Sequence, residues 1–333
     1  MPTDSLALIH INHLDRCVAV LREVGTSVEP LLRSAGLPVL ALGDPEAFVA
    51  SRLLYRFLGT AARREGLDDL GLRSALQVPI GSDAWTATSL ASAVTVHDAL
   101  ENLIRLGLAE SPRMHFALRG NPRGTWIEYR SSADSTTTSA TRIGEQYIVG
   151  ALVAFLRAAS GLAWSPTTVQ LRAKSSVGLD RWEPLAHARL LTGGPMLRIF
   201  VPRQLLARPV ATRGSVVSAA PAMTPDAEFV QDLRLALRPY LSEGLPKIRV
   251  AADIAGTSIR TLQRRLEGAG LDYSILTEQM RRERSQELVA STELRFIDVA
   301  HEVGFSDAAH FTRAFRRWTG TTPSAYRSES SGA

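Results

Sequence analysis

Two segments near the end of the chain carry arginine and glutamine side chains beside a regular apolar spacing. In the first segment Leu262 and Leu266 lie one helical turn apart, so Arg264 between them points toward another face of the helix. In the second segment Phe311 and Phe315 have the same spacing. Arginine and glutamine can hydrogen-bond to base edges in a major groove, and arginine can also hold phosphates. These residue types predict contact with a nucleic acid.

The two segments are copies of one pattern on a common spacing. Matched residues are offset by 49 positions, as Ala251 is from Ala300 and Leu262 from Phe311. In each copy a short apolar helix is followed by a turn and then by the helix that bears the arginines. This order is typical of a helix-turn-helix unit, whose second helix enters the major groove. Two such units at a fixed separation suit two contacts along one face of a DNA duplex.

The first unit is expected to have a short helix over residues 249–255 and a second helix capped by Ser258. The serine hydroxyl can accept a hydrogen bond from a free amide in the first turn. We expect Val250, Ala251 and Ile254 to face inward. The candidate DNA contacts on the outer face of the second helix are Arg260, Gln263 and Arg264.

In the second unit Gly304 supplies the turn, and Ser306 or Asp307 caps the helix that follows. Small alanines near the start of this helix allow close approach to the bases and apolar contact with a thymine methyl. The candidate DNA contacts here are Ala308, Ala309, His310 and Arg313 for bases, and Thr312, Arg316 and Arg317 for phosphates.

A single helix over Tyr273–Val289 is expected to join the two units. A rigid spacer of this length can hold two recognition helices about one turn of DNA apart, roughly 34 Å. Arg281, Arg282 and Arg284 on this helix interleave with Glu283. Both a solvated, salt-bridged face and a DNA contact remain open for these arginines.

The C-terminal segment resembles the signature of AraC/XylS-type transcription regulators. Over Ile297–Arg327 the matching residues are Ala300, Gly304, Phe305, Phe311, Arg313, Phe315, Gly320, Pro323, Tyr326 and Arg327. Ser258–Gly270 is similar to the first recognition helix of the same family, and the resemblance covers Lys247–Arg327. It implies a sequence-specific regulator of transcription that binds promoter or operator DNA and has RNA polymerase as a partner. Ala309 and His310 fall where the family varies, so they help to set the target sequence.

The first two thirds of the sequence mix helical and strand-like patterns. Met114–Leu118 and Thr125–Tyr129 alternate apolar and polar residues around a glycine-containing turn and predict a pair of strands. Ile143–Ala159 predicts a long buried helix, whereas Thr168–Ala173 and Met196–Val201 predict two further strands.

Two helix starts are expected from capping residues in this part. Thr95 and Asp98 form an approximate capping box for a helix over residues 94–108. Asp44 followed by Pro45 predicts another start, with aspartate as the cap and proline at the first helical position.

These patterns predict an α+β N-terminal sensor domain followed by an all-α C-terminal domain with two helix-turn-helix motifs. Residues 207–225 contain three prolines and have no periodicity, so we expect a linker there. The expected domains are an effector-sensing or oligomerisation domain over residues 1–206 and a DNA-binding domain over residues 226–333.

The front domain resembles the sensor domain of regulators of ornithine and related catabolism more than the cupin-like arabinose sensor. The residues that carry this resemblance are Gly25, Leu31-Leu32, Gly36-Leu37, Gly71-Leu72, 94–100 and 205–209. The resemblance implies a domain that senses an effector, dimerises or does both. Trp85, Arg130, Tyr147 and Trp164 are of the kinds that line effector pockets, and each would also fit into a core.

Composition and cysteine content set limits on the class of protein. The net charge of +5 only weakly favours an anionic partner. Cys17 is the single cysteine and lies in an apolar run, which predicts a buried, inert thiol and excludes a disulfide within the chain. We see no basic segment before an apolar run at the N-terminus, and no stretch of about 18 apolar residues. We therefore expect a cytoplasmic protein, associated with the nucleoid and without membrane contact.

Catalysis and bound cofactors are not expected. The glycines form no phosphate-binding loop, and His10 and His13 have no further cysteine or histidine nearby to complete a metal site. DNA-repair alkyltransferases with an AraC-like unit need reactive cysteines, which Cys17 does not provide. We therefore expect no enzyme activity, no cofactor and no metal.

Two interpretations of function remain open. In the first, the chain is a sequence-specific transcription regulator, an activator under the control of a small-molecule effector, and a homodimer is one of its candidate states. In the second, DNA binding is the same, but the front domain only oligomerises and binds no ligand.

Overall fold

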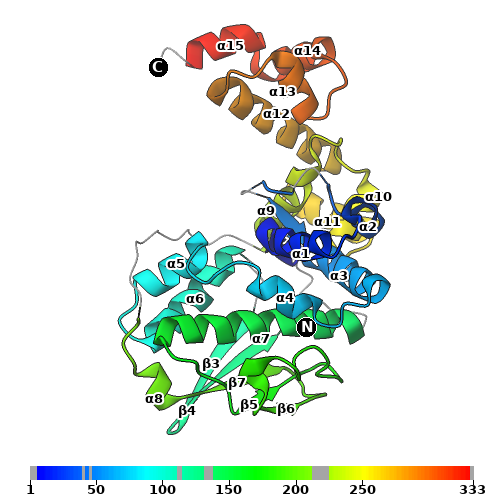
Figure 1. Ribbon diagram of the computed structural model, residues 1–333. Helices are drawn as coiled ribbons and strands as arrows, with labels where there is room; N and C mark the ends of the chain where they lie inside the picture. Colours follow the sequence, from blue (N-terminus) through cyan, green and yellow to red (C-terminus); the bar gives the residue numbers. More distant parts are fainter. Residues whose placement is uncertain are drawn as a thin grey trace. The chain divides into compact units, whose positions relative to one another are not determined.

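The computed structural model describes residues 6–39, 42–44, 47–110, 115–130, 138–211 and 225–330. The chain forms two compact units (Figure 1). The α+β unit comprises residues 7–37 and 51–221, and the helical unit comprises residues 1–6, 38–50 and 222–333.

A five-stranded sheet lies in the α+β unit, with its strands in the order β3, β4, β7, β5, β6. Neighbours pair antiparallel except β5 and β6, which are parallel. The strands are β3 His115–Asn121, β4 Gly124–Arg130, β5 Thr168–Gln170, β6 Arg189–Leu191 and β7 Leu197–Pro202. The four strands predicted from the sequence are confirmed, whereas β6 was not predicted.

The β3–β4 hairpin forms because the residues between the strands fit a tight turn. The side-chain oxygen of Asn121 accepts hydrogen bonds from the backbone N–H groups of Arg123, at 2.9 Å, and Gly124, at 3.1 Å. A Cβ at Gly124 would overlap the carbonyl oxygen of Val201 on β7. Glycine is therefore required where the neighbouring strand comes so close.

Helix α7, Thr138–Ser160, lies along one face of the sheet (Figure 1). Its Val149, Val153 and Leu156 are buried in one apolar cluster with Ile127 of β4 and Ile199 of β7, which confirms the predicted long buried helix. The unit begins with β1 Leu8–His10, and its other helices are α1 Ile11–Glu23, α2 Val28–Ala35, α3 Ser51–Glu65, α4 Leu70–Leu76, α5 Ala84–Ala91, α6 Val96–Glu110, the 3-10 turn η1 Glu183–Leu185 and α8 Arg203–Leu206.

Of the two predicted helix starts, one is confirmed and one is wrong. The Asp98 carboxylate accepts from the Thr95 N–H at 2.8 Å, and the Thr95 hydroxyl accepts from the Asp98 N–H at 3.2 Å, which completes the capping box. Pro45 and Glu46 lie outside the described residues, but Phe48–Ala50 form the strand β2 where the predicted helix would continue, and the next described helix begins at Ser51. The apolar residues of β2 pack against other elements of the helical unit, and extended backbone suits them there.

The helical unit consists of helices from residue 225 to residue 330. They are α9 Pro225–Leu237, the 3-10 turn η2 Arg238–Tyr240, α10 Ile248–Ile254, α11 Ile259–Gly268, α12 Tyr273–Ser291, α13 Phe296–Glu302, α14 Ala308–Thr319 and α15 Pro323–Ser330. Both helix-turn-helix units and the connecting helix α12 lie where the sequence predicts them.

One inward position was predicted wrongly in this unit. Ala251, Ala252 and Ile254 of α10 are buried, but the Val250 side chain is 48% exposed. The buried face of α10 is thus formed by Ala251, Ala252 and Ile254, and Val250 lies at its edge.

Residues 38–50 belong to the helical unit although their chain neighbours on both sides belong to the α+β unit. The Val39 N–H donates to the Glu243 carboxylate at 3.1 Å, and β2 contacts α9 and η2. The sequence contains no periodic pattern that would assign this segment to the C-terminal domain.

The expected linker begins as an ordered part of the α+β unit. The Val96 N–H donates to the Arg208 carbonyl at 2.9 Å, and residues 212–224 lie outside the described residues. Among the residues that the structure describes, no helix combines the length and the apolar character needed to cross a membrane.

Candidate functional site

Helix α11 presents one polar face outward and is fixed by its apolar face. The Ser258 hydroxyl accepts from the Thr261 N–H at 3.1 Å, as expected for the N-cap. Leu262 and Leu266 are fully buried, because they lie one turn apart on the side that meets the core. The predicted contacts Arg260, Gln263 and Arg264 are all exposed on this helix.

Helix α14 has the same construction, with a sharper turn before it. Gly304 has φ +78°, and a Cβ there would lie 2.6 Å from the Leu241 carbonyl oxygen, so only glycine fits. Asp307 accepts from the His310 N–H at 2.7 Å, and this backbone hydrogen bond holds the pKa of the Asp307 carboxyl below its usual range. Asp307 is therefore the cap, and Ser306 is not.

The predicted DNA contacts on α14 are exposed to different degrees. Ala309, His310, Arg313, Arg316 and Arg317 are exposed, while Ala308 and Thr312 are half-buried. The Thr312 hydroxyl donates to the Ala308 carbonyl at 2.7 Å and is therefore engaged within the helix.

One residue of this surface was missed by sequence reasoning. Glu278 of α12 accepts hydrogen bonds from Arg317 and from the indole N–H of Trp318, both at 2.8 Å. These hydrogen bonds, with that of Trp318 the larger cause, lower the pKa of the Glu278 carboxyl. Arg317 is thus oriented by the connecting helix, and only the folded packing of α12 on α14 reveals this.

The connecting helix α12 carries ion pairs on the face whose role could not be decided from the sequence. Arg284 pairs with Glu287 at 2.8 Å, and Glu283 pairs with Arg234 of α9 at 2.8 Å. The salt-bridged interpretation is therefore confirmed for Arg284.

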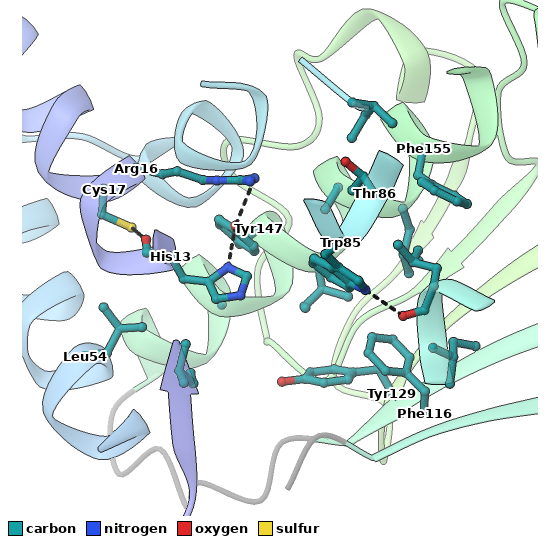
Figure 2. A pocket seen from close by; sticks show the side chains of 18 of the residues that line it. His13, Arg16, Cys17, Leu54, Trp85, Thr86, Phe116, Tyr129, Tyr147 and Phe155 are labelled. Atoms are coloured by element: carbon teal, nitrogen blue, oxygen red, sulfur yellow. Dashed lines mark hydrogen bonds between the residues drawn. The ribbon is translucent and has the colours of Figure 1, made fainter. Parts of the chain in front are cut away.

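A second candidate site is a cavity of the α+β unit with a volume of about 90 Å³. Residues from β1, α1, α3, α5, α6, α7, β3 and β4 line it (Figure 2). Of the residues predicted for an effector pocket, Trp85 and Tyr147 line this cavity. Trp164 packs against the main apolar cluster instead, and Arg130 is exposed at the end of β4.

Polar groups gather at one end of the cavity. The Tyr147 hydroxyl lies 2.7 Å from Nδ1 of His13 and accepts from Arg16 at 3.4 Å (Figure 2). Arg16 also pairs with Asp83 at 3.1 Å. Burial, with a smaller contribution from Arg16, lowers the pKa of His13 to about 3, so this imidazole is neutral. Burial also raises the pKa of the Tyr147 hydroxyl above its usual range.

Cys17 lies beside this group as a buried thiol. Its Sγ donates to the His13 carbonyl at 3.1 Å, and burial raises the pKa of the thiol to about 11. The thiolate form is therefore rare at neutral pH, which confirms the predicted inert cysteine.

Two helix-turn-helix units joined by a helix, with arginines exposed on the second helix of each, define a DNA-binding protein of the transcription-regulator class. Residues 25–210 match the family described as "Arabinose-binding domain of AraC transcription regulator, N-term", and residues 251–329 match a helix-turn-helix domain family. The first match alone covers more than half of the chain, so the protein belongs to the AraC family of transcription regulators. The families matched here are regulators and not enzymes.

Individual relatives are similar over very different lengths. The chain is 24% identical over 332 residues to the HTH-type transcriptional regulator VirS of Mycobacterium tuberculosis, covering 96% of each protein. It is 37% identical over 82 residues to the ornithine utilization regulator of Pseudomonas aeruginosa, covering 25% of this chain and about a quarter of that regulator. The solved structure of the regulator CdpR from the same organism has a TM-score of 0.41 at 20% identity and covers 90% of this chain and 96% of that one.

Proposed function

We propose that this regulator is an activator whose sequence-specific DNA binding is controlled by a small molecule held in the cavity of the α+β unit. The observation that supports this most is the cavity itself, which is lined by eight elements of the domain that precedes the DNA-binding helices. A mainly apolar cavity with a few convergent polar groups is the usual form of a ligand site.

In this proposal α11 and α14 read successive major grooves on one side of the duplex. The base-contacting residues are Arg260, Gln263 and Arg264 on α11 and Ala308, Ala309, His310 and Arg313 on α14. The phosphate-contacting residues are Thr312, Arg316 and Arg317, and for Thr312 this requires its hydroxyl to turn away from the Ala308 carbonyl. The exposure of the arginines and glutamine among them supports these roles, since a groove can reach them without unfolding either helix.

Effector control requires that the ligand bind one arrangement of the protein more tightly than another. In the favoured arrangement both helix-turn-helix units engage the same DNA, and RNA polymerase is recruited to the promoter. The protein would bind its promoter in the cytoplasm, at the nucleoid. A homodimer would be the state that binds a two-part operator. We also propose that the effector-sensing domain ends at residue 206 and that the DNA-binding domain begins at residue 226.

The alternative function leaves DNA binding unchanged and makes the α+β unit an oligomerisation module without a ligand. A promoter fused to a reporter, with the full-length protein and variants that fill the cavity, separates the two. Effector control is supported if reporter expression no longer changes with growth conditions in a cavity-filled variant that still binds the operator. An unchanged response favours the oligomerisation module.

A further inference from the structure

We infer that the cavity takes an uncharged, mainly apolar small molecule, such as a monocyclic aromatic with one hydrogen-bonding group, and not a sugar or an amino acid. This inference rests on the proposed role of the cavity as the effector site. It concerns the chemical class of the ligand. The names of the matched family and of the ornithine regulator would instead suggest a sugar or an amino acid.

The walls of the cavity are apolar over most of their area. The aromatic rings of Trp85, Phe116, Tyr129 and Phe155 surround one part of it (Figure 2). Leucine and isoleucine side chains form much of the remaining lining, among them Leu54, Leu58, Leu103, Ile104, Ile148 and Leu152. A sugar would bury most of its hydroxyl groups against these walls without hydrogen-bond partners, which is unfavourable.

Three polar groups of the wall, on Trp85, Thr86 and Cys17, are already used by the fold. The indole N–H of Trp85 donates to the Leu103 carbonyl at 2.9 Å, so the ring of Trp85 is left as a surface for packing. The Thr86 hydroxyl accepts from the Gly81 N–H at 2.9 Å, and the Cys17 thiol donates to a backbone carbonyl. These three groups can therefore hydrogen-bond to a ligand only by breaking a contact of the protein.

The polar end of the cavity is electrically balanced. Arg16 is 8% exposed and pairs with Asp83, and the buried His13 is neutral because its pKa is lowered to about 3. A ligand carboxylate or ammonium here would have to compete with an existing ion pair or remain buried without an opposite charge. A hydroxyl or carbonyl group can instead hydrogen-bond in the region of Tyr147 and His13.

The size of the cavity agrees with a small ligand. Its volume of about 90 Å³ is of the same order as the roughly 150 Å³ of an apolar cavity known to hold benzene. The proposal therefore names a ligand with a single ring or a short branched chain.

The test measures ligand binding to the full-length protein by calorimetry and by thermal shift. The probes are benzyl alcohol, toluene, benzoate, L-arabinose and L-ornithine. We expect saturable binding and a raised Tm with benzyl alcohol, and at least tenfold weaker or no binding with benzoate, arabinose and ornithine. Binding of toluene should be weaker than that of benzyl alcohol by the loss of one hydrogen bond.

Two variants locate the bound probe. Ala151→Leu fills the cavity and should weaken benzyl alcohol binding at least tenfold, whereas Ala154→Leu on the same helix does not line the cavity and should leave it unchanged. Tyr147→Phe should reduce the preference for benzyl alcohol over toluene and serves as a second variant if Ala151→Leu does not fold.

The outcomes separate the ligand class from the function of the cavity. If benzoate, ornithine or arabinose binds most tightly and Ala151→Leu abolishes that binding, the cavity is the effector site but the inferred class is wrong. If no probe binds, the inference is overturned. If in addition the reporter response survives in a folded Ala151→Leu variant, the proposed function of the cavity fails as well.

Discussion

Adjacent arginines on α11 have different surroundings and therefore different roles. Arg264 is exposed on the outer face, whereas the Arg265 guanidinium lies 4.6 Å from the centroid of the Phe229 ring. A cation over an aromatic face stabilises packing within the protein. At the scale of single residues, Arg264 is thus the side chain available to DNA, and Arg265 belongs to the fold.

Replacing exposed recognition-helix arginines should weaken specific DNA binding. We expect Arg264→Ala and Arg313→Ala each to cost roughly 1–3 kcal/mol if the side chain contacts a base. The measurement is a titration of operator DNA at fixed salt, and Arg265→Ala is the control because it should lower Tm more than affinity. Operator affinities equal to that of the wild type in both Arg264→Ala and Arg313→Ala would show that these residues have been misplaced.

The buried imidazole of His13 should make the stability of the α+β unit depend on pH. Its pKa is lowered from 6.5 to about 3, so between these values the unfolded chain binds a proton that the folded chain does not. The free energy of unfolding should therefore fall as the pH drops below 6.5, by about 1.4 kcal/mol per pH unit from this group. Above pH 6.5 the imidazole is neutral in both states and this contribution is constant.

Chemical denaturation at pH 7 and pH 5 can measure this dependence by comparing wild type with His13→Gln. The variant should lose less stability on acidification, and His187→Gln, an exposed histidine of the same unit, should behave as the wild type does. Equal pH slopes for wild type and His13→Gln would contradict a neutral buried imidazole.

At the scale of elements, each recognition helix is held by a cap, a turn and an apolar face. Gly304 is the turn residue with the tightest requirement, since it combines a left-handed φ with the contact to the Leu241 carbonyl. Gly270 after α11 has a similar φ of +72°, but no atom lies within 4 Å of the position of its missing Cβ. A substitution at Gly270 therefore tests the effect of the left-handed backbone alone, whereas a substitution at Gly304 adds steric overlap.

We expect Gly270→Ala to destabilise the helical unit by about 1–2 kcal/mol through the left-handed backbone alone. Gly304→Ala should cost more, because the added methyl group also meets a backbone oxygen, and it should reduce DNA binding by displacing α14. Urea denaturation and operator titration of both variants give the comparison. A Gly304→Ala variant no less stable than Gly270→Ala would be incompatible with the tight turn described.

Elements with long periodic patterns or capping residues could be predicted from the sequence. The repeated spacing around Leu262 and Phe311 places both helix-turn-helix units, and Ser258 and Asp307 act as caps as their residue types suggest. The three residues of β6 include no buried side chain, so the sequence there lacks the apolar alternation that marks the predicted strands. Asp44 suggests a helix start from its residue type, but Phe48–Ala50 form a strand instead because they pack in the helical unit.

The effector cavity could be predicted only in part, because its lining comes from residues far apart in the sequence. Trp85 and Tyr147 are noticeable as aromatic residues, but nothing local connects them with His13 and Arg16, which lie on another helix. The contact of Glu278 with α14 likewise joins residues that are far apart in the sequence. Such groups meet only through tertiary packing, which periodicity does not encode.

At the scale of the whole molecule, the two units are connected by more than one stretch of chain. Besides the segment after residue 211, residues 38–50 leave the α+β unit, pack in the helical unit and return. A conformational change in the α+β unit therefore has additional covalent routes to the DNA-binding helices. This organisation is compatible with effector control and does not require it.

The central claim is that one protomer reads two successive grooves with α11 and α14. Hydroxyl-radical footprinting of the full-length protein on a bound promoter, with Arg264→Ala and Arg313→Ala in parallel, tests it most directly. We predict two protected segments per protomer, about one helical turn of DNA apart on the same side of the duplex, each weakened by one of the two variants. Protection of only one groove per protomer, or weakening of the same segment by both variants, would contradict the account.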